Sequence, residues 1–167
     1  GHTIMTRRFV RWQALLAAMA VLSLAIAAQE NRSYSELPNF HQVNETLYRG
    51  GQPHPGGLKK LSELGIKTVI NLRGASEDTQ KEQAEAEASG MRYFNIPMPA
   101  LGRPTDEQVE RALAVIDARE NWPVFVHCQR GADRTGVIVA VYRILRDQWT
   151  AEQAIDEAKR FGLAGIQ

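Results

Sequence analysis

The residue types best suited to covalent chemistry lie in one short segment, residues 127–135, which reads His-Cys-Gln-Arg-Gly-Ala-Asp-Arg-Thr. It contains the only cysteine of the chain, Cys128. A cysteine thiolate is a good nucleophile, and a nearby helix N-terminus lowers the pKa of the thiol. Arg134 carries a planar, permanently charged guanidinium that binds two oxygens of a phosphate. The segment therefore predicts nucleophilic attack on a phosphorylated substrate.

The flanking residues predict the strand and the helix that would position this segment. Residues 122–126 form a short apolar run with β-branched valines, which is typical of a buried strand. Residues 136–142 begin a long apolar-rich run that favours a buried helix. Cys128 would then lie in a tight turn at a helix N-terminus, where unpaired backbone N–H groups bind anions.

The pattern His-Cys, two residues, Gly, two residues, Arg-Thr resembles the signature of the cysteine-dependent protein tyrosine phosphatase superfamily. This resemblance implies that Cys128 attacks phosphorus and forms a phosphocysteine intermediate, while Arg134 clamps the phosphate. Thr135 would donate a hydrogen bond to the sulfur, and His127 would orient the loop through hydrogen bonds to the backbone. The remaining phosphate oxygens would be held by the backbone N–H groups of Gln129, Arg130, Gly131, Ala132, Asp133 and Arg134.

Two further segments extend the resemblance. Residues 47–53, Leu-Tyr-Arg-Gly-Gly-Gln-Pro, and residues 65–73, Gly-Ile-Lys-Thr-Val-Ile-Asn-Leu-Arg, are similar to the opening of compact atypical dual-specificity phosphatases from bacteria. Plant and fungal members, which include inositol pyrophosphate phosphatases, have a similar opening. The resemblance covers residues 46–160. It implies a hydrolase that acts on phosphotyrosine and dual-specificity protein substrates, or on phosphoinositides and inositol polyphosphates.

The general acid of this family is missing from its usual place. Compact members carry an Asp about thirty residues before the cysteine to protonate the leaving oxygen. Met98 occupies that position, and no Asp or Glu occurs from Arg92 to Thr105. Three possibilities stay open: Asp133 donates the proton or only braces its neighbours, Asp106 swings in from a helix start, or no acid is needed because the leaving group is a phosphate of low pKa.

The order of the remaining elements predicts the fold class. Strands are expected at residues 46–49, 66–72, 91–96 and 122–126, and helices over 58–64, 77–89, 105–119, 136–147 and 150–160. This alternation predicts a single α/β domain with a central, mostly parallel four- to five-stranded sheet flanked by helices. The charges of residues 77–89 are expected on a solvated surface rather than in a site.

The first 28 residues have a different character. Residues 6–11 are basic, residues 14–28 are apolar apart from Ser23, and Ala-Ile-Ala at 25–27 offers a cleavage site. Residues 1–28 are therefore expected to be an expression remnant followed by a signal peptide, with export to the periplasm or secretion. An uncleaved N-terminal membrane anchor and a buried amphipathic helix are the alternatives. Residues 29–45 are expected to form a linker or irregular segment, and residues 46–167 the phosphatase domain.

Charge and composition narrow the partners. The formal net charge of +1 becomes −2 without the three arginines of residues 1–27, which gives no support for nucleic-acid binding. A single cysteine, with His41 and His54 outside ligand-like spacing, predicts no disulfide, no metal and no cofactor. Arg73, Arg103 and Arg130 either ring a site for a phosphorylated protein or a small polyphosphorylated substrate, or are solvated surface charges. The sequence carries no prediction of the oligomeric state.

Two other functions compete with the phosphatase hypothesis. The missing acid at Met98 leaves open a phosphate-binding module with little turnover, although such a module has no need of the Cys128 thiol. A sulfur-transfer enzyme of rhodanese type also uses a loop cysteine, but the ending Arg134-Thr135 fits that class poorly.

Overall fold

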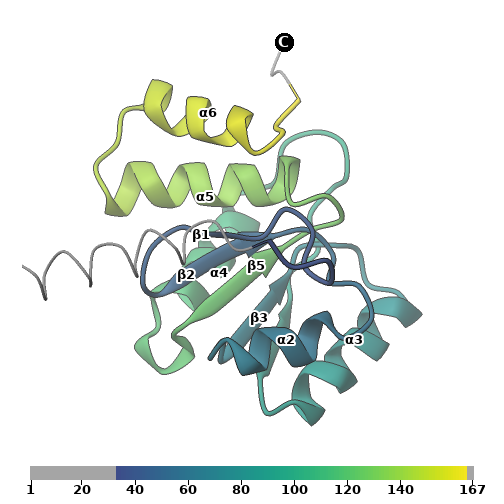
Figure 1. Ribbon diagram of the computed structural model, residues 1–167. Helices are drawn as coiled ribbons and strands as arrows, with labels where there is room; N and C mark the ends of the chain where they lie inside the picture. Colours follow the sequence, from purple (N-terminus) through teal and green to yellow (C-terminus); the bar gives the residue numbers. More distant parts are fainter. Residues whose placement is uncertain (1–32, 165–167) are drawn as a thin grey trace, which may run out of the picture. The chain divides into compact units, whose positions relative to one another are not determined.

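Each segment that reads as a strand in the sequence forms one, and a short fifth strand joins them in a single sheet (Figure 1). The computed structural model describes residues 33–164, except for the side chain of Glu77. In chain order the elements are β1 (His41–Gln42), β2 (Leu47–Gly50), α2 (Gly57–Glu63), β3 (Thr68–Asn71), α3 (Glu77–Ala88), β4 (Arg92–Asn95), α4 (Asp106–Asp117), the 3₁₀ turn η1 (Arg119–Asn121), β5 (Val124–His127), α5 (Asp133–Arg146) and α6 (Ala151–Arg160).

The strands run in the order β1-β2-β5-β3-β4, and only the β1–β2 pair is antiparallel. The α/β class and the mostly parallel sheet are therefore confirmed. Parallel register places the last residues of four strands in one row, Gly50 beside His127, His127 beside Asn71, and Asn71 beside Asn95. Open α/β sheets bind ligands at this carboxyl edge, and Cys128 follows directly after His127.

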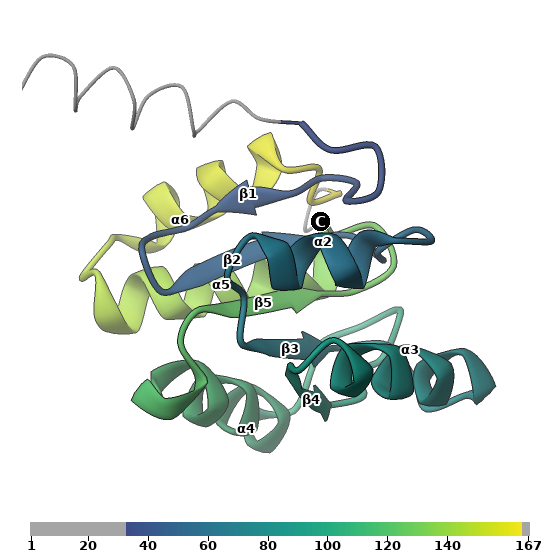
Figure 2. The same ribbon diagram turned by 60° about the horizontal axis from the view of Figure 1, so that its bottom comes forward.

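Helices cover both faces of the sheet, as Figures 1 and 2 show. Val124 and Val126 of β5 face a core that includes residues of α4 and α5, and α6 packs on α5. Phe125 points to the opposite face, into a second core with residues of α2 and α3. Alternate residues of a strand point to opposite faces, so this central strand is buried on both sides. The strand that leads directly into Cys128 is thus packed on both faces.

The segment before β2 contributes more than the linker or irregular segment expected over residues 29–45. From Ser33 onward much of it lacks regular structure, but Leu37 is buried and β1 pairs with β2. The ring of Phe40 stacks on that of Tyr48, with centroids 5.6 Å apart. A two-residue strand and two isolated apolar residues leave no periodic pattern in the sequence, so pattern reasoning misses this segment's part in the domain.

The expectations for the N-terminus fall on residues 1–28, which lie outside the described residues. Within residues 33–164, no helix has the length and apolar character needed to cross a bilayer.

Candidate active site

The loop between β5 and α5, residues 128–132, packs so closely on the loop after β2 that glycine is required at its bend. Gly131 has φ +72°, and an added Cβ would lie 2.3 Å from the carbonyl carbon of Gly50. Gly51 is also tightly packed, since its Cβ would lie 3.2 Å from the backbone of Gln129 and Arg130. The Gly-Gly pair after β2 and the glycine of residues 127–135 therefore fit one another.

Four consecutive carbonyls of this loop point outward, and each accepts a hydrogen bond from a different part of the chain. We call the four donor residues the outer donors. The bonds run from His127 Nδ1 to the Cys128 oxygen (3.1 Å), from the Gln52 backbone N–H to the Gln129 oxygen (3.1 Å), from Asn39 Nδ2 to the Arg130 oxygen (3.1 Å) and from Arg49 Nη2 to the Gly131 oxygen (2.9 Å). In a trans peptide plane the C=O and the following N–H point in opposite directions. Outward carbonyls therefore direct the N–H groups of residues 129–132 to the inside of the loop, where they form an anion nest.

Cys128 is the first residue of this loop and is 2% exposed. Burial alone raises the pKa of its thiol. Hydrogen bonds from the Thr135 hydroxyl and from the backbone N–H groups of Thr135 and Gly131, together with the charge of Arg134, outweigh burial and lower the pKa below its ordinary value. The Thr135 hydroxyl is buried and has no other hydrogen-bond partner among the described residues, which leaves it free to lower the pKa of the thiol. The site favours a thiolate.

His127 and Glu82 form a buried pair behind the loop. The Nε2 atom of His127 lies 2.5 Å from Oε1 of Glu82, and the two side chains are 0% and 5% exposed. Glu82 comes from α3, whose charges the sequence places on a solvated surface. For Glu82 that prediction is wrong, because the side of α3 that carries Thr79, Glu82 and Ala86 faces the sheet.

Arg49 of β2 is a buried cation on the other side of the loop. It is 1% exposed, and its guanidinium carbon lies 4.4 Å from the centroid of the Phe161 ring. Its Nε and Nη1 atoms have no hydrogen-bond partner among residues 33–164. Burial lowers the pKa of Arg49 to about 10, partly offset by the charges of Glu157 and Cys128. It stays charged at neutral pH, and its hydrogen bond to the Gly131 carbonyl supports the loop.

A pocket of about 440 Å³ opens over the loop. Arg130, Asp133 and Arg134 supply its charged lining. None of the carboxylates in the described part of the chain forms a salt bridge with Arg134, so its guanidinium is available to a phosphate. The rest of the lining is apolar or small and consists of Pro99, Ala100, Leu101, Gly102, Pro104, Val137, Leu163 and Ala164.

Asp133 stands at the first position of α5 and is fully engaged. Its Oδ2 accepts a hydrogen bond of 2.5 Å from Arg130, and its Oδ1 accepts one of 3.2 Å from the Ala164 N–H. Burial raises its pKa, but these bonds and the charges of Arg130 and Arg134 lower it below the ordinary value. At neutral pH the carboxylate is therefore ionised, and in that form it accepts hydrogen bonds from its neighbours and has no proton to donate. Its role as a proton donor stays a prediction.

The other residues weighed for the acid and the rim lie away from the pocket lining. Met98 is 4% exposed and belongs to the core. Asp106 is exposed, 3.8 Å from the exposed Arg103. Arg73 donates to the side-chain oxygen of Gln52. Of the three basic residues proposed for the rim, Arg130 lines the pocket and Arg73 and Arg103 do not.

Residues 33–164 contain no group of three or more His, Cys, Asp or Glu side chains placed to hold a metal ion.

A family model described as a DSP-PTPase phosphatase fused to NAD+ kinase matches residues 17–164 of the chain. The chain belongs to the atypical dual-specificity phosphatases of the cysteine-dependent protein tyrosine phosphatase superfamily. This is the family that residues 127–135 and the two earlier segments resemble, and that prediction is confirmed.

Curated dual-specificity phosphatases match three quarters of the chain. Inositol diphosphatase DSP4 of Arabidopsis thaliana is 31% identical over 131 residues, which are 75% of this chain and 65% of that protein. The dual specificity protein phosphatase TpbA of Pseudomonas aeruginosa (strain UCBPP-PA14) is 31% identical over 125 residues, which are 74% of this chain and 55% of TpbA. The chain thus spans less than two thirds of the length of either relative.

Solved structures of such phosphatases share the fold. The crystal structure of P. aeruginosa TpbA has a TM-score of 0.65 at 27% identity, covering 80% of this chain and 84% of that chain. The core catalytic domain of the PP-IP phosphatase SIW14 from S. cerevisiae, in complex with citrate, has a TM-score of 0.72 at 24% identity, covering 81% and 82% of the two chains.

Apart from His127, the residues of the dual-specificity phosphatase signature lie on the inner side of the loop, and the sequence predicts their roles. For most of the outer donors the sequence predicts no role. Arg49 and Gln52 lie in a segment that resembles the family but suggests no role for them. Asn39 lies in the expected linker. For Glu82 a signal existed, since residues 79, 82 and 86 share one side of a helix, but a glutamate among many charges looks like a surface residue.

Proposed function

We propose that this chain hydrolyses phosphate esters through a phosphocysteine intermediate. The observation that carries the proposal is the thiol of Cys128, whose pKa is lowered inside a nest of inward N–H groups near Arg134, which forms no salt bridge with any carboxylate of residues 33–164. The thiolate attacks phosphorus, the S–P bond forms as the bond to the leaving oxygen breaks, and Arg134 with the nest neutralises the transferring oxygens.

The second step releases phosphate. A water molecule attacks phosphorus of the phosphocysteine, the S–P bond breaks, and the electron pair returns to the Cys128 sulfur. The hydroxyl of Thr135, which has no oxygen or nitrogen partner of its own among residues 33–164, stabilises the departing thiolate. Thr135 thus acts in both steps through the thiolate.

The walls of the pocket favour phosphotyrosine as the substrate class. Apolar and small side chains line most of it, and one of its two arginines is neutralised by Asp133. An aromatic ring fits such walls better than a densely charged ring does. TpbA, which is similar to this chain, has been crystallised as a Cys-to-Ser variant in complex with pTyr.

Inositol diphosphates are a second candidate, because the described pocket holds no carboxylic acid that is free to donate a proton. When the terminal phosphoryl group moves to the sulfur, the leaving group is the inositol-bound inner phosphate, a weak base that needs no such donor. DSP4, another relative, is an inositol diphosphatase.

Phosphate release tests the proposal. Wild type, Cys128→Ser and Arg134→Met are assayed with p-nitrophenyl phosphate, a phosphotyrosine peptide, an inositol diphosphate and a phosphoinositide. We expect turnover by the wild type alone, with the phosphotyrosine peptide preferred. Absence of Cys128-dependent turnover on all four would contradict the proposal. Phosphate binding without turnover would then indicate a binding module, and thiosulfate:cyanide sulfur transfer a rhodanese-like enzyme.

We also propose that the chain is an exported bacterial protein. Support comes from the basic, apolar and small-residue layout of residues 6–28 and from the similarity to TpbA of P. aeruginosa. Residues 5–32 fused to an enzyme that is active only outside the cytoplasm should yield active, processed reporter. Retention of full-length fusion in the membrane would indicate an uncleaved anchor instead.

A further inference from the structure

Two residues of the segment that follows α6, Leu163 and Ala164, line the active-site pocket, and the proposed mechanism gives them no role. We call residues 161–164 the α6 wall. Helices α5 and α6 lie side by side and antiparallel (Figure 1), so the end of α6 lies beside the start of α5. A Cβ added to Gly136, in the first turn of α5, would lie 3.8 Å from Cδ1 of Leu163. The Leu163 side chain therefore packs on the turn that carries Arg134.

The backbone at the end of α6 fixes the direction in which Leu163 leaves the helix. Gly162 has φ +97°, a conformation that glycine adopts readily. Its N–H donates to the Lys159 carbonyl at 3.0 Å, and the N–H of Leu163 donates to the Ala158 carbonyl at 3.0 Å. These are the two hydrogen bonds of a Schellman motif, which ends a helix in a defined turn.

Hydrogen bonds join the α6 wall to the residues around the nucleophile. The N–H of Ala164 donates to Oδ1 of Asp133 at 3.2 Å. Nδ2 of Asn39 donates to the carbonyl of Phe161 and to the carbonyl of Arg130, both at 3.1 Å. The wall is thus bonded to both ends of the stretch from residue 130 to residue 133, and it keeps its place relative to the bound phosphate.

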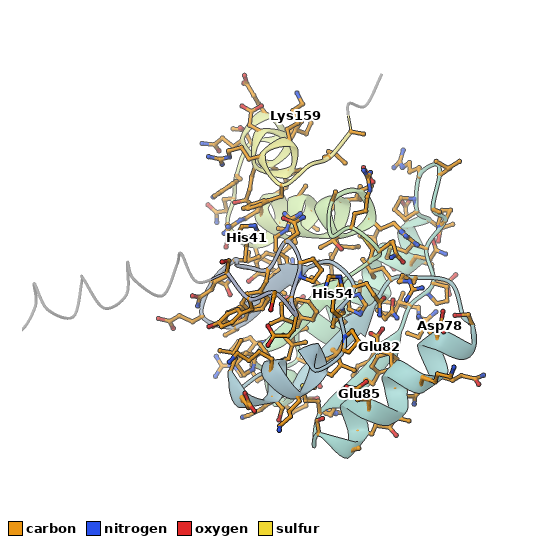
Figure 3. All side chains as sticks on the ribbon, turned by 45° about the vertical axis from the view of Figure 1, so that its right-hand side comes forward. His41, His54, Asp78, Glu82, Glu85 and Lys159 are labelled. Atoms are coloured by element: carbon orange, nitrogen blue, oxygen red, sulfur yellow. The ribbon has the colours of Figure 1, made fainter. Side chains whose placement is uncertain are left out.

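The ring of Phe161 anchors the start of the α6 wall. Its centroid lies 4.3 Å from that of the His41 ring and 4.4 Å from the guanidinium carbon of Arg49. Figure 3 labels His41 and, in the last turn of α6, Lys159, whose side chain is exposed. The chain thus turns inward directly after α6, and the wall is held at both of its ends.

Leu163 supplies apolar surface with a fixed position to the pocket. It is half-buried, whereas Leu101, another apolar residue of the lining, is 91% exposed and so has few atoms around it. A phosphate bound by Arg134 leaves the group that it carries in this pocket. An aromatic ring gains free energy from contact with a leucine side chain, while a ring that carries several phosphates loses hydration there.

We propose that Leu163 is a specificity-determining residue, whose side chain contacts the ring of the substrate and favours aryl phosphates such as phosphotyrosine over inositol phosphates. The inference rests on the phosphatase function proposed above. The α6 wall holds this side chain beside Arg134, so that the phosphate and the ring are recognised by neighbouring groups.

Leu163→Ala tests this assignment with two substrates that differ in the ring. Phosphate release is measured from p-nitrophenyl phosphate and from acetyl phosphate, which has no ring; both leaving groups are weak bases. The ratio of the two kcat/KM values should fall about tenfold, because the variant removes apolar contact with the ring alone.

Leu145→Ala is the matched control, with the same chemical change on α5 at a residue that is 54% exposed and outside the pocket lining. It should keep the ratio of the wild type. An unchanged ratio in Leu163→Ala, or an equal loss on both substrates, would overturn the proposal, since either result would limit Leu163 to a structural role.

Leu163→Lys is a second variant that keeps apolar cover on Gly136, because the stem of lysine is a chain of methylene groups. Its charge should attract a substrate with several phosphates. The ratio of kcat/KM for an inositol diphosphate to that for a phosphotyrosine peptide should rise at least about tenfold. A folded variant with the wild-type ratio would contradict the proposal, whether or not Leu163→Ala folds.

Binding to Cys128→Ser separates this proposal from the phosphatase function, because calorimetry needs no turnover. The probes are O-phosphotyrosine and inorganic phosphate. Adding Leu163→Ala to Cys128→Ser should weaken the binding of phosphotyrosine about tenfold more than that of phosphate. Equal weakening of both would refute the role of Leu163. The expected difference in an enzyme without turnover would support Leu163 and count against the phosphatase function alone.

Discussion

The inner and outer sides of the loop over residues 128–132 are built in different ways. The inner side consists of backbone N–H groups, Cys128 and, at the adjoining helix start, Arg134, all within one short stretch of chain. Apart from His127, the donors on the outer side come from distant segments, and Asn39 is 91 positions away from the Arg130 carbonyl that it binds. Local sequence therefore supplies the reacting groups, while the whole fold supplies the shape that makes them effective.

Gly131 joins the two sides, and Gly131→Ala should have the largest effect among the outer-side changes. Its φ of +72° would cost an alanine about 1–2 kcal/mol, and the Cβ would overlap the Gly50 backbone at 2.3 Å. The loop must then move. We expect kcat/KM for p-nitrophenyl phosphate to fall at least about 100-fold, as misplacement of reacting groups by about 1 Å allows.

Gly90→Ala is the control for strain without contact, because Gly90 has φ +80° and no heavy atom within 4 Å of the added Cβ. Its free energy of unfolding should fall by about 1–2 kcal/mol with kcat/KM unchanged. Equal activity of the two alanine variants would show that the loop tolerates displacement. It would contradict the idea that contacts on the outer side of the loop set the activity of the inner side.

Arg49→Met removes one outer donor and keeps an unbranched apolar side chain. We expect kcat/KM to fall about tenfold, since the Gly131 peptide loses its support. The free energy of unfolding should change by no more than about 2 kcal/mol, because losing the bond and relieving two unpartnered buried nitrogens oppose one another.

The comparison for this variant is Arg143→Met. Arg143 also lies 4.4 Å over an aromatic ring, that of Trp149, and it pairs with Glu157 away from the loop. Urea unfolding should show Arg143→Met to be destabilised while its turnover stays normal. Normal turnover in Arg49→Met as well would show that the hydrogen bond from Arg49 to the loop does not affect catalysis.

Much of this architecture can be predicted from the sequence, and the reason differs by region. The alternation of apolar strands with helices predicts the sheet, because each element's own periodicity reports its burial. Cys128, Arg134 and Thr135 are predictable because their spacing is local. Asn39 and Glu82 are not, since a lone polar residue in an irregular segment or a charged helix has no periodic signal. Their partners lie 91 and 45 positions away, and only the fold brings them together.

Asn39→Gly should have a smaller effect than Arg49→Met. Asn39 has φ +51°, which glycine adopts freely, so the change removes only the side chain with its bonds to the carbonyls of Arg130 and Phe161 and to the ring of His41. We expect a loss of about 1–2 kcal/mol in the free energy of unfolding and roughly threefold in kcat/KM.

Gln148→Gly, at the other non-glycine residue with positive φ among those described, is the matched control and should leave kcat/KM unchanged. If Asn39→Gly also kept wild-type kcat/KM, the irregular segment before β2 would stabilise the fold without shaping the loop.

Asp133→Asn should affect kcat/KM no more than Asn39→Gly does, and it separates a brace from an acid. The Asp133 carboxylate accepts from Arg130 and its pKa is lowered, so we expect about a threefold loss of kcat/KM that is the same for aryl phosphates with good and poor leaving groups. A loss that grows steeply as the leaving group becomes more basic, with loss of the basic limb of the pH profile, would assign Asp133 as the proton donor.

The central claim, that Cys128 becomes phosphorylated during turnover, can be measured directly. Wild-type enzyme mixed with p-nitrophenyl phosphate is quenched in acid within the first turnovers, digested and examined by mass spectrometry. The peptide with Cys128 should carry one phosphoryl group on sulfur, and it should be unmodified in Cys128→Ser and in enzyme quenched without substrate. Turnover with no phosphoryl group on that peptide, or with the group on another residue, would contradict the account.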